Sequence, residues 1–354
     1  MKTGLALSGG GAKGAYQVGL IKALNECGIQ IDAISGASIG SINSAIIASS
    51  DNLTQAEVRL RKLWQCLENE SPLSANFPEI LTFLALLGFQ LKSFGLLKTI
   101  LKTIVSLPIK SSNLISGPVI QKFLALDPVL MQDKPLFKLM DKFIDIEKIT
   151  DKLPFYVSVF PSKGAFADLA GYFFAHTGLM ENLKSEFIHL QSLDKEERKS
   201  AILASAAIPL LYSAKMVRGK LYSDGGIGQP CSSQGNTPVT PLYEMGCERI
   251  IVSHLTDASL WTRDDFPNAT ILEIRPETDI ERDGMLKDML GFGHRKISSW
   301  MDQGYRDAKR CINKVSEPLK AIHLLSTAAK LMDESSVRTD KAMQKMRQTR
   351  IKTQ

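Results

Sequence analysis

A serine flanked by two glycines lies between two apolar stretches near the start of the chain. The segment is Gly36-Ala37-Ser38-Ile39-Gly40, which follows the apolar run 31–35 and precedes small residues that continue to about Ala48. A strand that turns sharply into a helix exposes such a serine hydroxyl at the tip of the turn, and flanking glycines permit that turn. The helix N-terminus stabilises negative charge that develops beside the serine. The spacing predicts a nucleophile elbow, against the alternative of a serine that only caps a helix.

A second glycine-rich segment follows the first apolar run and consists of Gly9, Gly10, Gly11, Ala12, Lys13 and Gly14. Glycines let the backbone approach a ligand closely, and successive N–H groups beside a helix N-terminus form a hole for an anion. The same residues also suit a tight turn that binds nothing, so both interpretations stay open at this point. A dinucleotide site needs an acidic residue at the end of the second strand, whereas Asp32 lies at its start. A P-loop is excluded because no Gly-Lys-Ser/Thr sequence follows.

A serine nucleophile requires a base, and two residues downstream are candidates. Asp224 follows the short segment 220–223 and precedes Gly225 and Gly226, which allow a tight turn. His254 lies at the end of the run 249–255 and would complete a Ser–Asp–His set in chain order. The residues themselves leave the choice between the aspartate and the histidine open.

Together these segments resemble the patatin-like phospholipase family. Residues 5–24 resemble its first strand, glycine loop and helix; residues 36–40 resemble its nucleophile elbow, and residues 224–226 its Asp-Gly-Gly/Ala motif. The segments 204–209 (ASAAIP) and 236–239 (NTPV) resemble two further elements of the family. The resemblance covers about 1–50 and 150–275. Two departures are Lys13, where the family often has arginine, and a longer gap before Asn236, at about 228–233.

The resemblance implies a three-layer α/β/α fold and a Ser–Asp dyad without histidine. By this resemblance Ser38 is the nucleophile and Asp224 is the base, while the glycine loop supplies the oxyanion hole. Family members hydrolyse acyl esters of phospholipids, lysophospholipids or neutral lipids, and we expect neither a metal nor a cofactor. Three alternatives remain: a lipid acyltransferase on the same dyad, a non-catalytic nucleotide-binding domain, and an inactive lipid-binding module.

The hydrophobic pattern around these motifs indicates an α/β protein with a mostly parallel central sheet. Helices are expected at 15–26, from the elbow to about Ala48, at 198–207 after Asp194, and from 281 onward. Strands are expected at 3–8, 31–35, 154–160, 165–174, 220–223, 249–255 and 270–275. We expect a catalytic domain at 1–275 with a helical insertion at about 52–150. A helical C-terminal region at 276–354 ends in a basic tail.

Composition and charge exclude several other classes of protein. The 354 residues are 44% hydrophobic and 23% charged, which is typical of a folded globular chain rather than a disordered one. The five cysteines form no Cys-x-x-Cys pair, so neither a disulfide framework nor a zinc site is indicated. The N-terminal apolar stretch is too short for a signal peptide, and the twelve-residue run 80–91 is too short to span a bilayer. We expect a cytoplasmic protein, peripheral on a membrane.

The segment 91–107 has separate apolar and polar helical faces, with Lys92, Lys98 and Lys102 on the polar one. No Asp or Glu occurs between residues 80 and 126, and the chain has a net charge of +6. A basic amphipathic helix binds anionic lipid surfaces, but the same pattern also fits a core helix whose lysines reach solvent. We expect a lipid surface as the partner, leave an activating protein open, and expect no nucleic acid.

Overall fold

A computed structural model describes residues 2–69; 133–176 except 151; 183–278 except 210, 229–233, 256–260 and 262; and 280, 288, 291–293, 295–315 and 332. The chain divides into two compact units, Met1–Ala308 and Lys309–Gln354. In the second unit, residues 309–315 are helical. The predicted amphipathic segment 91–107 with Lys92, Lys98 and Lys102 lies outside the described residues, as does the basic tail.

The first unit alternates strands and helices along the chain. Its strands are β1 (Thr3–Leu7), β2 (Ala33–Ala37), β3 (Phe155–Pro161), β4 (Glu186–His189), β5 (Lys215–Val217), β6 (Lys220–Asp224), β7 (Arg249–Ser253) and β8 (Thr270–Ile274). Its α-helices are α1 (Ala15–Glu26), α2 (Ile39–Ala48), α3 (Leu53–Asn69), α7 (Lys134–Phe143), α8 (Ala165–His176), α9 (Lys195–Ser205) and α10 (Thr240–Glu244). Short 3₁₀ turns are η1 (Gly11–Gly14), η2 (Ile146–Lys148), η3 (Leu190–Ser192) and η4 (Gly225–Ile227). Residues 295–308 are also helical.

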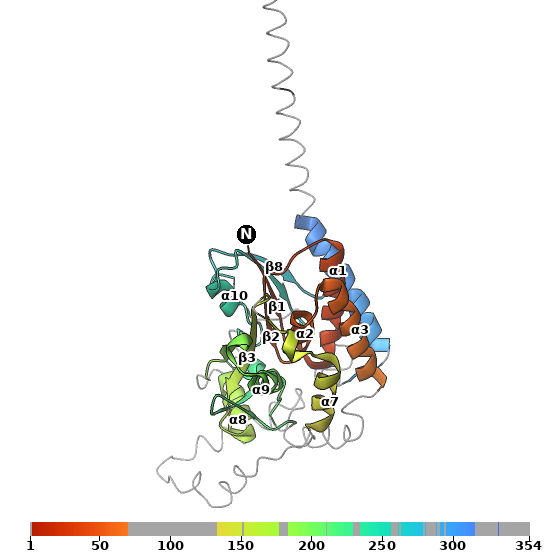
Figure 1. Ribbon diagram of the computed structural model, residues 1–354. Coiled ribbons are helices and arrows are strands. Elements are labelled where there is room, and N and C mark those ends of the chain that lie inside the picture. Colours follow the sequence, from red (N-terminus) through yellow and green to blue (C-terminus); the bar gives the residue numbers. More distant parts are fainter. Residues whose placement is uncertain are drawn as a thin grey trace, which may run out of the picture. The chain divides into compact units, whose positions relative to one another are not determined.

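The strands form one mixed sheet in the order β5-β6-β3-β2-β1-β7-β8, with β4 also paired to β3. Figure 1 labels β3, β2, β1 and β8 of this sheet. The strands β3, β2, β1, β7 and β8 are parallel to one another, whereas β4 and β6 pair antiparallel with β3 and β5 pairs antiparallel with β6. Because β1 and β2 are parallel, the loops after them lie at one edge of the sheet. The glycine loop and the Ser38 turn are those two loops.

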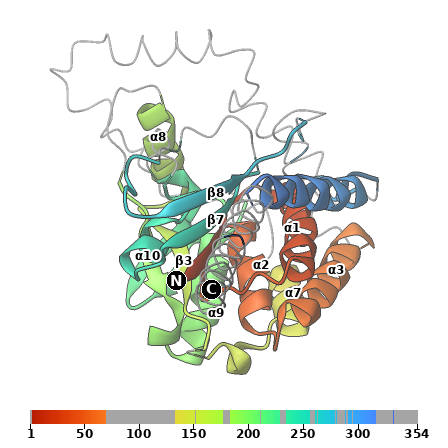
Figure 2. The same ribbon diagram turned by 90° about the horizontal axis from the view of Figure 1, so that it is seen from above.

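Helices cover both faces of the sheet, as the family resemblance implies. Figure 2 shows α1, α2 and α3 on one side of the sheet and α10 on the other. On the α10 side the core contains Ala6, Ala33, Leu242, Ile250 and Val252, all fully buried. The strands β1, β2, β3 and β7 are buried along most of their length because both faces are covered, which is typical of parallel sheets. The expected three-layer fold with a mostly parallel sheet is therefore confirmed.

Most predicted elements match the structure, and the differences have local causes. The helix expected at 15–26 coincides with α1, and Asp194 accepts a hydrogen bond from the Glu197 N–H (2.8 Å) at the start of α9. The second strand is Ala33–Ala37 rather than 31–35, so it continues directly to the elbow. The strand expected at 165–174 is wrong, because that segment forms α8. Its first turn is fixed by the Asp168 N–H, which donates to the Gly164 carbonyl (2.9 Å).

Two strands, β4 and β5, were not predicted. They have four and three residues, and each pairs with only one neighbouring strand. Such short segments do not show a period of their own. Among the described residues, no helix is both long enough and apolar enough to cross a membrane.

Candidate active site

Ser38 occupies the turn between β2 and α2 in a backbone conformation that residues other than glycine rarely adopt, with φ 51° and ψ −126°. Such strain persists only where the surroundings hold it. The Ser38 N–H donates to the hydroxyl of Ser205 (2.9 Å), and the Ser38 carbonyl accepts from the Ser41 N–H (2.9 Å) and hydroxyl (2.6 Å). The sharp turn is thus fixed on both sides, and the serine is 7% exposed.

The two glycines of the elbow lie where a side chain would collide with backbone. A Cβ on Gly36 would lie 2.5 Å from the Gly40 carbonyl oxygen, and one on Gly40 would collide with the carbonyl of Leu7 in β1. Ala37 is the last residue of β2 and Ile39 is the first of α2. The Gly-x-Ser-x-Gly spacing therefore lets the helix begin directly against two strands.

The glycine loop lies directly beside Ser38. A Cβ on Gly9 would be 2.8 Å from the Ser38 Cβ and 2.5 Å from the Asn236 Oδ1. The Gly9 N–H already donates to the Asn236 carbonyl (3.3 Å), so it is not available to a ligand. Gly10 and Gly11 follow, and their N–H groups precede the first hydrogen-bonded turn of η1.

The second half of the glycine loop is buried in the protein core. Ala12, Lys13 and Gly14 are buried within η1, and Lys13 is only 3% exposed. Gly14 packs against Ile39, the first residue of α2, which we call the elbow helix. These three residues connect the loop to α1, whereas Gly11 faces the cavity described below.

Asp224 is brought to Ser38 by the end of β6. Its carboxylate lies beside the Ser38 hydroxyl and accepts a hydrogen bond from the Gly226 N–H (2.8 Å). Its own N–H donates to the Ala207 carbonyl (3.0 Å). Burial raises the pKa of Asp224 to about 6, against the lowering effect of the nearby Ser38 hydroxyl and of the Gly226 N–H. Tyr172 of α8 lies near enough that burial and this carboxylate raise the pKa of its phenol.

The turn after Asp224 is held between two neighbours. A Cβ on Gly225 would collide with the carbonyl of Ser158 in β3, and a Cβ on Gly226 would lie 2.8 Å from the Asn236 Oδ1. The Asn236 Nδ2 donates to the Gly9 carbonyl (3.4 Å). Asn236 therefore contacts both the Asp-Gly-Gly turn and the glycine loop, which places the two at a fixed separation.

His254, the other candidate base, faces a different group. Its Nε2 lies 3.0 Å from Glu273 Oε2 on the neighbouring strand β8, and its ring packs edge-on against Trp261 with centroids 5.8 Å apart. Burial lowers the pKa of His254. Three hydrogen bonds, from His254, Arg263 and Arg275, lower the pKa of Glu273 to about 2 although burial opposes them. The structure thus brings together Ser38 and Asp224, and it pairs His254 with Glu273.

An apolar cavity opens at Ser38. Its walls come from the elbow helix, from α3 and α7, from the segment after α9, and from Phe292. The lining residues are Gly11, Ser38, Ile39, Ile42, Ile46, Leu63, Leu67, Leu136, Leu139, Met140, Phe143, Ile144, Ala206, Ile208, Leu211, Tyr212 and Phe292. The Ser38 hydroxyl thus lies at the end of a cavity whose lining is almost entirely apolar.

Sequence reasoning missed the residues that form the cavity walls. The lining residues of α7 recur at intervals of three and four, a spacing that is visible in the sequence but is typical of any buried helix face. Ser205 and Asn236 lie in segments that were noted for the family resemblance, although their contacts with Ser38 and Gly9 were not predicted. Within the described ranges, no cluster of three or more His, Cys, Asp or Glu side chains could hold a metal ion.

Comparison with protein families gives one extended match: the model described as "Patatin-like phospholipase" matches residues 5–242. Two similar curated proteins match over short segments. "Patatin-like phospholipase domain-containing protein 7" of Rattus norvegicus is 45% identical over 58 residues, which is 16% of this chain and 4% of that protein. "Lysophospholipase nte1" of Aspergillus terreus is 51% identical over 59 residues, which is 17% of this chain and 4% of that protein. The chain therefore matches only a small part of these relatives.

Solved structures with similarity to this chain include two bacterial proteins. VipD from Legionella pneumophila is 15% identical, with a TM-score of 0.41, over 88% of this chain and 67% of that chain. The type III effector ExoU is 14% identical, with a TM-score of 0.35, over 88% of this chain and 53% of that chain.

Proposed function

The chain belongs to the patatin-like phospholipase family of lipid acyl hydrolases, and from this premise we propose that it cleaves the carboxylic ester bonds of phospholipids or lysophospholipids. The single observation that carries the proposal is the position of the buried Asp224 carboxylate beside the hydroxyl of Ser38, which lies at the end of an apolar cavity. In this proposal Ser38 is the nucleophile and Asp224 is the general base.

The first half of the reaction transfers the acyl group to the enzyme. Asp224 accepts the Ser38 proton while the serine oxygen attacks the ester carbonyl carbon, and the protonated Asp224 then gives that proton to the leaving alcohol. A pKa of about 6 suits both steps, because the carboxylate is ionised at neutral pH and still accepts a proton readily. Water then attacks the acyl-enzyme, again with Asp224 as base, and releases the fatty acid.

The tetrahedral intermediate needs N–H donors for its oxyanion. We assign this role to the N–H groups of Gly10 and Gly11 together with that of Ile39, which is in the first turn of α2. Gly9 serves another purpose, since its N–H donates to Asn236 and its missing side chain lets Ser38 and Asn236 approach the loop closely. One such donor typically contributes about 10²–10³ in rate.

The acyl chain of the substrate fits the cavity between α2, α3 and α7. Its lining is almost entirely aliphatic and aromatic, so a hydrocarbon chain gains about 0.8 kcal/mol for each methylene that it buries there. We also propose that Lys92, Lys98 and Lys102 bring the enzyme to an anionic lipid surface, as their sequence pattern indicates. Transfer of the acyl group to an alcohol instead of water would use the same dyad.

A panel of lipids tests this proposal. Phospholipids, lysophospholipids and neutral lipids are incubated with the wild type and with Ser38→Ala, with and without a monoacylglycerol acceptor, and products are identified by mass spectrometry. Release of fatty acid by the wild type alone supports hydrolysis, and acylated acceptor in its place indicates a transferase. Equal release by both proteins, or none by either, would refute the proposal.

A further inference from the structure

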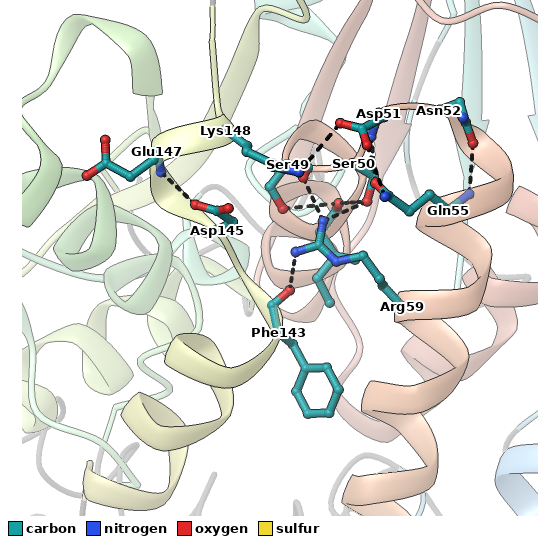
Figure 3. Close-up of polar contacts among 11 residues, drawn as sticks. Ser49, Ser50, Asp51, Asn52, Gln55, Arg59, Phe143, Asp145, Glu147 and Lys148 are labelled. Atoms are coloured by element: carbon teal, nitrogen blue, oxygen red, sulfur yellow. Dashed lines mark hydrogen bonds and ion pairs between the residues drawn. The ribbon is translucent and has the colours of Figure 1, made fainter.

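One arginine on α3 binds the C-terminal ends of two other helices. The Arg59 Nη1 donates to the Ser49 carbonyl (2.6 Å) and to the Ser50 hydroxyl (2.9 Å), and Nη2 donates to the Phe143 carbonyl (2.8 Å). Figure 3 shows the guanidinium lying between these groups. Ser49 is the C-cap residue of α2, and Phe143 is the last residue of α7.

This contact suits the chemistry of arginine and of helix ends. The last carbonyls of a helix lack hydrogen-bond partners and carry partial negative charge, so a cation near them is stabilising. The planar guanidinium has donors that point in several directions, which lets Arg59 reach two helices at once, whereas a lysine ammonium is a single point charge. Burial is the main cause of the lowered pKa of Arg59, so the contact is partly shielded from water.

The three helices that meet at Arg59 are walls of the same cavity. The elbow helix α2 contributes Ile42 and Ile46, α3 contributes Leu63 and Leu67, and α7 contributes a row of its own. That row consists of Leu136, Leu139, Met140 and Phe143. Arg59 does not line the cavity itself, but it fixes the end of α7 relative to the helix that begins at Ser38.

The other end of α7 has a separate polar attachment. Asp133, which precedes the helix, accepts hydrogen bonds from the Ser213 hydroxyl (2.8 Å) and from the Lys215 ammonium. Between these two ends, α7 faces the cavity with apolar side chains only. Loss of the Arg59 contact would therefore weaken the attachment of one end of a cavity wall, where Asp141 also accepts from Lys199 (3.0 Å), and leave the other end attached.

We propose that Arg59 is a specificity-determining residue that holds α7 against the cavity and thereby sets the preference for long acyl chains. This inference rests on the proposed esterase function. A chain that reaches the far end of the cavity needs the α7 wall in place, whereas a short acyl group at Ser38 does not. Each methylene that a pocket accommodates poorly changes discrimination by roughly tenfold or more.

The test compares p-nitrophenyl palmitate with p-nitrophenyl butyrate for the wild type, Arg59→Met and Arg59→Lys. Arg61→Met is the matched control, because Arg61 lies on the same helix but contacts Glu57 (3.3 Å) and the Met301 sulfur (3.7 Å). In Arg59→Met the ratio of kcat/KM for palmitate over butyrate should fall by at least about tenfold. Most of the loss should be in KM, Arg59→Lys should be intermediate, and Arg61→Met should leave the ratio within about twofold of the wild type.

A role in folding alone would lower both activities by the same factor, and that result would overturn the inference. An unchanged ratio in Arg59→Met, or an equal fall in Arg61→Met, would also overturn it. If the wild type cleaves neither ester, the proposed function fails, and calorimetric binding of laurate and hexanoate then tests Arg59 separately. Arg59→Met should weaken laurate binding by about tenfold relative to hexanoate, and equal binding by both proteins would refute the role of Arg59.

Discussion

Replacement of Asp224 by asparagine separates the charge of this residue from its shape. The asparagine Oδ1 can accept from the Gly226 N–H as the carboxylate does, and its amide can hydrogen-bond to the Ser38 oxygen. The turn after β6 should therefore keep its conformation. Only the ability to accept the Ser38 proton is lost, so turnover should fall by at least about 10².

The same substitution should stabilise the fold at neutral pH. Burial raises the pKa of Asp224 from 3.8 to about 6, so the folded state holds the proton more tightly than the unfolded state. At about pH 3 both states are protonated and the carboxyl costs almost nothing. Between the unfolded pKa of 3.8 and the folded pKa of about 6 the free energy of unfolding falls with rising pH, and above that the full cost remains. The difference between these two pKa values corresponds to about 3 kcal/mol. Asp224→Asn should be more stable than the wild type by up to that amount at about pH 8 and equal to it at about pH 3.

Two measurements check these expectations together. The kcat/KM of the wild type for a soluble short-chain ester should rise with pH to a plateau, with its midpoint at about 6, because the ionised carboxylate is the active form. Urea unfolding of both proteins at the two pH values gives the stability difference. His254→Gln is the control, since its imidazole faces Glu273, and this variant should keep both the rate and the midpoint.

Three results would refute this reasoning. One is an active Asp224→Asn variant. Another is a kcat/KM of His254→Gln that no longer falls at low pH, which would make the histidine the base. The third is a variant that is less stable than the wild type at about pH 8, which would mean that the charge of Asp224 stabilises the fold.

Further predictions concern the nucleophile, its support and the membrane. Ser38→Ala should abolish labelling by a fluorophosphonate, and retained labelling would contradict its role. Ser205→Ala leaves the buried Ser38 N–H unpaired, at a cost of about 1–3 kcal/mol. Because this hydrogen bond holds the strained turn at Ser38, kcat should fall about tenfold or more with KM unchanged. An unaltered kcat would show that the turn keeps its conformation without Ser205. Neutralising Lys92, Lys98 and Lys102 should weaken co-sedimentation with anionic vesicles at low salt, by about 1 kcal/mol for each lysine, while a soluble ester is still cleaved. Equal sedimentation of both proteins would assign that segment to the core.

The motifs around Ser38 could be predicted from sequence because close backbone contacts require them. Gly40 has the carbonyl of Leu7 where a side chain would be, and Gly9 has Ser38 and Asn236 there. Such contacts exclude every residue except glycine at those positions, so the need for close backbone packing is visible in a few consecutive residues. The order of strand, loop and helix followed from the same short segments, and β1, α1 and α2 were predicted close to their observed bounds.

The choice between Asp224 and His254 could not be made from the residues alone. Both lie at or next to the end of a strand, and the sheet order decides which of them is near the elbow. β6 pairs with β3 beside β2, whereas β7 lies on the far side of β1, next to β8. His254 therefore meets Glu273 across the β7–β8 pair, and only the family resemblance indicated the aspartate beforehand.

The cavity walls were beyond sequence reasoning for a different reason. Arg59 binds the carbonyl of Phe143, which is 84 residues later in the chain. Every residue has such a backbone carbonyl, so the sequence does not mark this one as the acceptor. An arginine on the polar side of an amphipathic helix is expected to be solvated, so nothing in residues 53–69 distinguishes Arg59 from Arg61. The elbow and the glycine loop are thus specified by local patterns, while the shape of the cavity depends on contacts that form only after distant helices have packed. It follows that substitutions at such contacts should change which acyl chains are accepted while Ser38 and Asp224 remain in place.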